Sequence, residues 1–237
     1  MICHQQRCLY IHIPKTAGQS VERVFLALNG LTWETREALL LRPNDDPDKG
    51  PPRLAHLTAG DYLRYGYLTP DQFQSYFKFA FVRNPWARMV SFYKYLSYGV
   101  TFPEFVFGDF QKKLWTEMYW FTRPQAEFLY DNQGHLLVDF VGRFERLQDD
   151  FNEICQRVGL PPTPLPHVNK SKKHAQKVQF SLRPRRFLRY LRHRGYRPPA
   201  PQFPHWRDYY DEATRALVAE LYRADIERFG YTFDAGE

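Results

Sequence analysis

The segment YIHIPKTAGQS, residues 10–20, constrains the fold of this chain more than any other. An apolar run, CLYIHI, leads into it, and the amphipathic stretch SVERVFLAL overlaps its end. One helical face of that stretch carries Val21, Val24, Phe25 and Leu28. The order is therefore strand, loop and helix, with Lys15 in a loop of Pro, Thr, Ala and Gly. This arrangement is typical of a phosphate-binding corner in an α/β domain.

The residue types of this corner suit an anion. A helix that begins near Gly18 leaves its first backbone N–H groups unpaired and directs its positive dipole end at the loop. Glycine lets a ligand approach the backbone, the hydroxyls of Thr16 and Ser20 can donate hydrogen bonds, and Lys15 adds a mobile charge. The order P-K-T-A-G-x-S differs from the GxxxxGK[ST] loop of ATP- and GTP-binding proteins. The corner alone therefore fits a phosphate site and a purely structural turn equally well.

A second constellation lies in FVRNPWARMVSFYKYL, residues 81–96. Arg83 ends a predicted strand, and Ser91 lies about two turns into the helix that Pro85 begins. Carboxyl ends of parallel strands form the ligand crevice of an α/β sheet, so we expect Arg83 on the same side as Lys15. A guanidinium and a hydroxyl can hold a second phosphate, although a capping arginine and a packed serine would look the same. Two such corners predict a ligand with two separated anionic groups.

The remaining pattern alternates strands and helices. Strands are predicted at 8–13, 77–83 and 135–144, with helices between and after them, including 146–158 and 208–228. Strands separated by helices favour a mostly parallel sheet that is covered on both faces. The length of 237 residues suits one α/β domain.

Charge and cysteine content limit the protein class. Between Ile154 and Arg207 there are 13 Lys and Arg residues and no acidic residue, which indicates either a solvated face or an anion-binding surface. No apolar run approaches the roughly 20 residues of a transmembrane helix. Three cysteines without CxxC spacing favour a reduced, cytoplasmic protein. The spacing of Cys3, His4, Cys8 and His12 matches no standard zinc pattern, so we expect no metal site.

Taken together, these motifs resemble the PAPS-dependent sulfotransferases, in the branch of the carbohydrate sulfotransferases and their soluble bacterial relatives. HIPKTAGQS is similar to the family's loop for the 5′-phosphosulfate of PAPS (3′-phosphoadenosine 5′-phosphosulfate), and VRNPWARMVSFY resembles its 3′-phosphate element. Further similar segments are RPQAEFLYDNQGHLLVDFVGRFERLQDDFNEICQRVGL, LPHVNKS and YYDEATRALVAELYRADIERFGY. The chain departs from the family pattern in two places. Gln19 stands where the family usually has Thr or another small residue, and a basic insert occupies about residues 172–204.

The resemblance implies a P-loop-NTPase-like three-layer α/β fold, with a single sulfotransferase domain over residues 1–237. It also implies in-line transfer of a sulfuryl group from PAPS to an acceptor hydroxyl, in which Lys15 stabilises the leaving oxygen. No metal is expected, because lysine and the helix terminus neutralise the charge. The residues implied in PAPS binding are Lys15, Thr16, Ala17, Gly18, Gln19, Ser20, Arg83, Ser91 and Ser171.

His56, in RLAHLTAGDY, is the predicted general base, since carbohydrate members of the family resemble this chain in placing a histidine between the two PAPS elements. The ordinary pKa of histidine suits the task, although a histidine hydrogen-bonded in a loop is an alternative reading. Asp61 is the reserve candidate for the base. Residues expected near the acceptor are Asp61, Arg123, Gln125, His167, Asn169, Arg185 and Arg186.

The acceptor is expected to be a carbohydrate. Seven arginines and no acid between residues 183 and 197 suggest an anionic glycan. A small lipid or a secondary-metabolite alcohol is the alternative acceptor, because it would use the same PAPS motifs. A nucleic-acid-binding protein is the alternative from a different class, but the chain lacks an RNA-module signature, so no nucleic-acid partner is expected. The sequence does not determine the oligomeric state.

Overall fold

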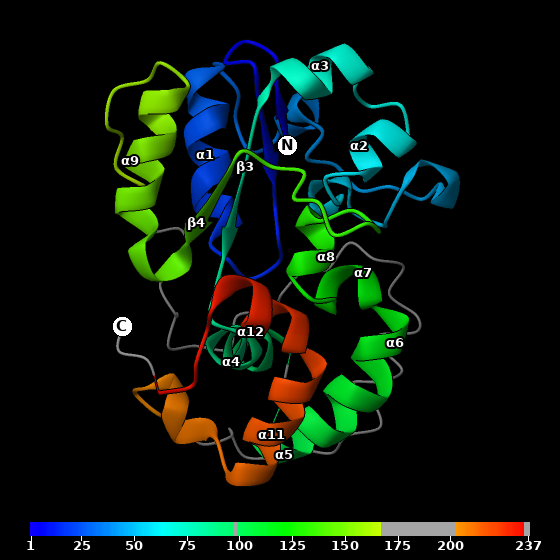
Figure 1. Ribbon diagram of the computed structural model, residues 1–237, viewed down its shortest axis with the longest axis vertical. Coiled ribbons are helices and arrows are strands. Elements are labelled where there is room, and N and C mark those ends of the chain that lie inside the picture. The colour runs from blue at the N-terminus through cyan, green and yellow to red at the C-terminus, as the bar shows by residue number, and fades with distance from the viewer. Residues whose placement is uncertain (97–98, 167–201, 235–237) are drawn as a thin grey trace.

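A four-stranded sheet forms the centre of the computed structural model, which describes residues 1–96, 99–166 and 202–234 (Figure 1). Its strands in spatial order are β1 (Ile2–Cys3), β2 (Cys8–Ile11), β3 (Phe77–Val82) and β4 (Phe140–Arg143). β2, β3 and β4 are parallel, and β1 pairs antiparallel with β2. Ile11 lies opposite Ala80 in this register, so the chain leaves β2 and β3 at the same edge of the sheet.

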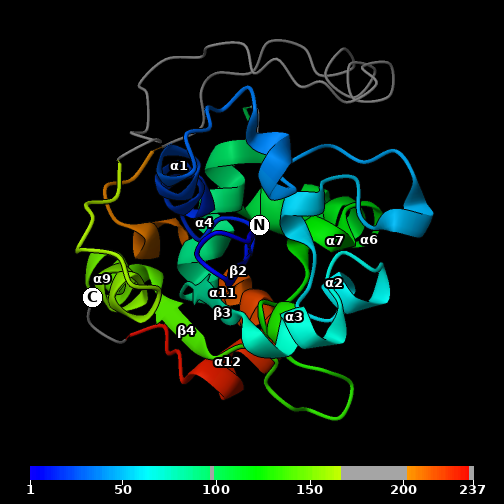
Figure 2. The ribbon, with the colours of Figure 1, turned by 90° about the horizontal axis from the view of Figure 1, so that it is seen from above.

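Helices cover both faces of the sheet, as Figure 2 shows from above. One face packs against α1 (Gly18–Leu28) and α9 (Leu147–Arg157). The other face packs against η3 (Leu54–His56), α2 (Asp61–Arg64), α3 (Pro70–Ser75) and α8 (Ala126–Leu129). Alternate side chains of β2 separate accordingly, with Tyr10 in the first apolar cluster and Leu9 and Ile11 in the second. The predicted α/β class, with three layers and a mostly parallel sheet, is confirmed.

A third apolar cluster, rich in aromatic side chains, lies beyond the carboxyl ends of the strands. Its helices are α4 (Pro85–Leu96), α5 (Phe102–Glu104), the π-helix η4 (Phe105–Leu114), α6 (Trp115–Glu117), α7 (Tyr119–Thr122), η6 (Trp206–Tyr209), α11 (Glu212–Leu221) and α12 (Arg223–Phe229). These helices form the lower half of Figure 1. Short 3₁₀ helices η1 (Arg36–Leu39), η2 (Pro47–Lys49) and η5 (Phe144–Arg146) complete the connections.

Two predicted elements differ from the structure. The strand predicted at 135–144 begins only at Phe140, because Leu136 and Leu137 pair with the segment around Tyr130 and not with the sheet. The helix predicted at 208–228 is divided at Tyr222, and a capping box at Asp211 fixes its start. The basic insert falls mainly at residues 167–201, outside the described residues, so the boundaries of the domain stay a prediction.

Candidate active site

The loop between β2 and α1 is tightly folded. Lys15 and Ala17 adopt left-handed conformations, with φ of 72° and 66°. Thr16 is wholly buried, and its hydroxyl donates to the Ile13 carbonyl over 2.8 Å. α1 then begins at Gly18, and no side chain among the described residues caps it. The first turn of α1 therefore presents backbone N–H groups beside Lys15, as the sequence predicts.

Lys15 lies in a confined position at this corner. Its ammonium is 4.0 Å from the centre of the Tyr95 ring, on α4. Burial lowers the pKa of Lys15 to about 8, and the charge of Arg83 adds to the effect. Lys15 is thus mainly protonated at neutral pH, but only weakly solvated, which makes an anionic ligand its natural partner.

Arg83 comes directly after β3 and lies beside the loop. Its Nη1 donates to the Lys15 carbonyl over 3.4 Å, and its guanidinium is 4.0 Å from the centre of the Phe144 ring. Ser91 is partly exposed on α4, one helical turn before Tyr95. The structure therefore brings together the two corners that the sequence predicts at neighbouring strand ends.

His56 is buried near the same loop. Its Nδ1 lies 2.9 Å from the His12 carbonyl oxygen. Since a carbonyl only accepts, Nδ1 carries the proton and Nε2 carries the lone pair. The His56 ring also contacts Trp120 and Phe121, with ring centres 5.9 and 5.6 Å away. Burial, followed by the charge of His12, holds the pKa of His56 well below its ordinary value, so the imidazole is neutral at physiological pH.

Aromatic rings connect Lys15 with His56. The Phe121 ring contacts His56 and lies 6.3 Å from the Tyr95 ring, which in turn faces Lys15. An acceptor hydroxyl between a cation and an unprotonated imidazole nitrogen can be deprotonated as it attacks an electrophile.

A buried pair, His12 and Glu22, was not predicted. His12 Nδ1 lies 2.5 Å from Glu22 Oε1, and both side chains are nearly inaccessible to solvent. A Cβ atom on Gly18 would lie 1.9 Å from His12 Nε2, so glycine here makes room for the imidazole. No local pattern indicates the pair, because His12 lies before α1 and Glu22 lies within it.

Arg88 links the loop to the helical part of the molecule and was also not predicted. It is wholly buried, and it donates from Nε to the Pro14 carbonyl and from Nη1 to the Arg123 carbonyl. These bonds hold the residue before Lys15 against the segment that precedes α8.

Comparison with known proteins agrees with this geometry. Residues 1–232 match the profile of the Sulfotransferase family (Sulfotransfer_2). The chain belongs to this family. The family and the sheet with its flanking helices together support the predicted P-loop-like fold, and the family consists of enzymes that carry out sulfotransfer.

The chain is distantly similar to carbohydrate sulfotransferases. It is 26% identical to carbohydrate sulfotransferase 14 of Homo sapiens over 98% of this chain and 59% of that protein. It is 25% identical to carbohydrate sulfotransferase 11 of Mus musculus over 64% of this chain and 50% of that protein. An uncharacterized protein of Archaeoglobus fulgidus is 32% identical over 38% of this chain and 72% of its own length. The chain thus spans about three fifths of carbohydrate sulfotransferase 14.

No solved structure gave a significant match. Among the helices of residues 1–96, 99–166 and 202–234, none is both long enough and apolar enough to cross a membrane. In the same ranges, no three His, Cys, Asp or Glu side chains are grouped so that they could hold a metal ion.

The predicted acceptor residues differ in their surroundings. The buried Gln125 amide bonds the Arg83 backbone and Asp225, so Gln125 has a structural role in this member of the family, and its place near the acceptor stays a prediction. Asp61 begins α2 and accepts from the Thr58 N–H over 2.9 Å. The Arg123 guanidinium lies over Tyr119, 5.4 Å from its ring centre. The predicted residues outside the described ranges are His167, Asn169, Ser171, Arg185 and Arg186.

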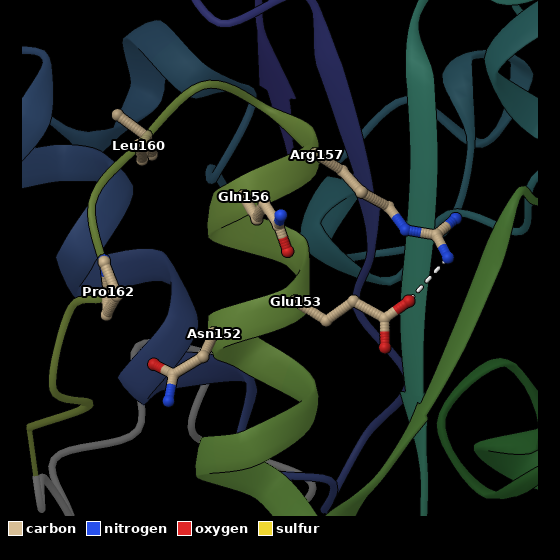
Figure 3. A pocket seen from close by; sticks show the side chains of 6 residues that line it. All are labelled: Asn152, Glu153, Gln156, Arg157, Leu160 and Pro162. Carbon is tan, nitrogen blue, oxygen red and sulfur yellow. Dashed lines mark hydrogen bonds and ion pairs between the residues drawn. The ribbon is translucent and has the colours of Figure 1, made fainter.

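A surface hollow of about 870 Å³ lies away from this site, at the carboxyl end of α9 (Figure 3). Its lining residues are Asn152, Glu153, Gln156, Arg157, Leu160 and Pro162. The Arg157 guanidinium packs on Phe77 and Phe140, the first residues of β3 and β4, so the hollow is at the opposite end of the sheet from Lys15. Its rim carries an Arg157–Glu153 ion pair, and it contains none of the predicted site residues.

Proposed function

We propose that this sulfotransferase transfers a sulfuryl group from PAPS to a carbohydrate hydroxyl. The observation that carries the proposal is the meeting of Lys15, Arg83 and the uncapped start of α1 at one edge of the sheet. Two cations at neighbouring strand ends fit a nucleotide that has phosphate groups at both its 5′ and its 3′ positions. PAPS would supply the activated sulfuryl group.

At the donor end, the residues of this chain bind and neutralise charge. The N–H groups of residues 16–19 and the Lys15 ammonium would hold the 5′-phosphosulfate, whereas the Ser20 N–H already donates to the Ala17 carbonyl and Ser20 would contribute its hydroxyl. Arg83 with Ser91 would hold the 3′-phosphate. As the bond between the bridging oxygen and the sulfur breaks, negative charge grows on that oxygen, and the Lys15 ammonium would stabilise it. The buried Arg88 supports this assignment, because it fixes the Pro14 carbonyl next to Lys15.

At the acceptor end, His56 would accept the hydroxyl proton at Nε2 while the acceptor oxygen forms its bond to sulfur. The hydrogen bond from Nδ1 to His12 supports this role, since it leaves Nε2 unprotonated. The resulting imidazolium would then lose its proton to solvent. Asp61 is a weaker candidate, because its carboxylate already accepts the Thr58 N–H.

The carbohydrate acceptor and the cellular location are the finer parts of the proposal. Similarity to proteins named carbohydrate sulfotransferases supports the acceptor class, and a small lipid or metabolite alcohol is the alternative. The basic segment, with Arg185 and Arg186, would attract an anionic glycan. Three free cysteines, Cys3, Cys8 and Cys155, are compatible with a reducing, cytoplasmic compartment.

The donor assignment is tested by ligand preference. Calorimetry should show that 3′-phosphoadenosine 5′-phosphate binds much more tightly than AMP, which lacks the 3′-phosphate. Arg83→Ala should remove most of this preference, because a charge-assisted hydrogen bond contributes about 1.5–3 kcal/mol. Equal affinities for the two nucleotides in the wild-type protein would contradict the roles of Arg83 and Ser91.

The catalytic assignment is tested with labelled PAPS and a panel of sugars and small alcohols. With the acceptor that this panel identifies, His56→Ala should lower kcat by about 10²–10⁴-fold, the usual contribution of a general base. Its affinity for 3′-phosphoadenosine 5′-phosphate should match that of the wild type. Activity within a few-fold of the wild type would exclude His56, and Asp61→Asn would then be measured in the same assay.

A further inference from the structure

The side chain of Gln125 binds the backbone of Arg83, the arginine that we expect to hold the 3′-phosphate. Gln125 Oε1 accepts the Arg83 N–H over 2.8 Å, and Gln125 Nε2 donates to the Arg83 carbonyl over 2.8 Å. An amide can accept and donate at the same time, whereas a carboxylate only accepts. Gln125 therefore fixes both backbone groups of Arg83 at the point where the chain leaves β3.

Asp225, on α12, fixes Gln125 in turn. Its Oδ2 accepts the Gln125 backbone N–H over 2.9 Å and Gln125 Nε2 over 3.1 Å, and its Oδ1 accepts the Ala126 N–H over 2.8 Å. Gln125 and Asp225 are both completely buried. The two N–H donors of the Gln125 amide thus have one partner each, Arg83 and Asp225. Because buried polar groups are costly to leave unpaired, these bonds favour one orientation of the Gln125 amide.

The Arg83 side chain is held near Lys15 by contacts from other elements. Its guanidinium lies 4.0 Å from the centre of the Phe144 ring, and its Nη1 donates to the Lys15 carbonyl over 3.4 Å. With the backbone fixed by Gln125, the guanidinium is oriented before a ligand arrives. An arginine that is already oriented loses less conformational freedom when it binds an anion. The bonds to Gln125 should therefore affect how tightly Arg83 binds a phosphate group.

We propose that Gln125 and Asp225 are positioning residues for Arg83, and that they determine how strongly the site prefers a nucleotide with a 3′-phosphate. This inference rests on the proposed role of Arg83. Gln125 acts through the Arg83 backbone, and Asp225 acts through Gln125. The helix α12 thereby contributes to recognition of the donor, although its own side chains need not touch the nucleotide.

The first test measures nucleotide preference by calorimetry. Gln125→Glu keeps the shape of the side chain and an acceptor for the Arg83 N–H, but it removes the amide donor and places a second carboxyl group beside Asp225. The ratio of the Kd of AMP to the Kd of 3′-phosphoadenosine 5′-phosphate should fall about tenfold, with the Kd of AMP within about threefold of the wild type. Asp225→Asn, which keeps one acceptor oxygen, should lower the ratio less. A general loss of structure would instead weaken both nucleotides alike.

A matched control is Gln133→Glu, the same substitution at an exposed glutamine, which should leave the ratio unchanged. Arg83→Ala provides a second background, because it removes the guanidinium but keeps the backbone groups that Gln125 binds. If Gln125 acts through the Arg83 side chain, adding Gln125→Glu to Arg83→Ala should not lower the ratio further. A tenfold fall in both backgrounds would overturn the proposal.

The outcomes distinguish this inference from the donor assignment. If the wild-type protein prefers 3′-phosphoadenosine 5′-phosphate and Gln125→Glu retains the full preference, the positioning role is wrong and the role of Arg83 stands. If the wild-type protein binds both nucleotides equally, the role of Arg83 fails, and the role of Gln125 fails with it.

The second test uses the wild-type protein and does not depend on a variant that folds. NMR measures hydrogen exchange at the Arg83 backbone amide and at the Gln125 side-chain amide, with each nucleotide at saturation. If these bonds favour binding of the 3′-phosphate, then the bound 3′-phosphate must stabilise them by the same factor. Both amides should therefore exchange about tenfold more slowly with 3′-phosphoadenosine 5′-phosphate than with AMP. Equal exchange rates with the two nucleotides would overturn the proposal.

Discussion

At the scale of single residues, the environment of Lys15 defines the proposed donor site. Its ammonium packs on Tyr95, and Arg83 lies close enough to donate to its carbonyl. Burial and the Arg83 charge lower the pKa of Lys15 to about 8. A ligand with two anionic groups would compensate the charges of Lys15 and Arg83, so ligand binding and protonation of Lys15 should be coupled.

This coupling gives a measurable proton uptake. Ligand-free Lys15 loses its proton as the pH rises through about 8, and an anionic ligand raises its pKa again. Binding of 3′-phosphoadenosine 5′-phosphate at pH 8 should therefore take up about half a proton. Calorimetry in buffers of different ionisation enthalpy measures this number. Lys15→Met should abolish the uptake, and equal uptake in both proteins would show that another group is responsible.

At the scale of elements, the start of α1 adjoins both the predicted phosphate loop and the His12–Glu22 pair beside the proposed base. α1 has no side-chain cap among the described residues, which leaves its first turn available to a ligand. The helix face that follows holds Glu22 against His12, and Gly18 is the point of closest approach. One helix terminus thus joins the proposed donor site to the proposed base.

Substitution of Gly18 tests this close packing. Gly18→Ala would place a Cβ atom 1.9 Å from His12 Nε2, so the His12 ring must move. We expect a loss of about 1–3 kcal/mol in the free energy of unfolding, typical of overpacking, together with a lower kcat. Gly108→Ala is the matched control, because no atom lies within 4 Å of its added Cβ, and it should be neutral or slightly stabilising. Denaturant unfolding measures the free energy of unfolding of both variants. Equal values for Gly18→Ala and Gly108→Ala would refute the packing argument.

At the scale of the whole molecule, the sheet separates the candidate site from the hollow at the end of α9. Its carboxyl edge meets the aromatic helical cluster, where Lys15, Arg83 and His56 gather, while the hollow of Figure 3 lies at its amino edge. The chain as a whole has a net charge of +7, and its basic residues concentrate between Ile154 and Arg207. Such a charge distribution acts on an anionic partner over distances of about a Debye length.

The basic segment is therefore expected to affect the acceptor more than the donor. Changing Arg185, Arg186 and Arg189 to Ser should raise the acceptor KM, most strongly at low ionic strength, with PAPS affinity nearly unchanged. A control that changes the exposed Arg42, Arg64 and Arg223 to Ser removes the same charge elsewhere. Steady-state kinetics at two salt concentrations compares the two triple variants. An unchanged KM would indicate a solvated segment, and loss of PAPS binding would indicate that the segment contacts the nucleotide.

The sequence by itself determined the α/β class, the strand–loop–helix corner at Lys15 and its meeting with Arg83. These features follow from local periodicity and from the rule that parallel strands end at one edge. For the same reason, the helix predicted at 146–158 agrees within one residue at each end with α9 (Leu147–Arg157). Leu136 and Leu137 are apolar and extended, but they pair with the segment around Tyr130, a choice that periodicity does not reveal.

Only the tertiary structure decided how the buried polar groups combine. Glu22 occurs in a helix whose pattern gives no reason to bury a carboxylate, and its partner His12 lies on a strand end ten residues earlier. Arg88 reaches the Pro14 and Arg123 carbonyls, and Gln125 reaches Arg83 and Asp225, across long intervals of sequence. Such groups are tolerated inside a protein only when a partner is present, and the partners are supplied by the packing of distant elements. Local sequence places the charges of the proposed donor site, whereas the fold makes His56 neutral and determines which of its ring nitrogens carries the lone pair.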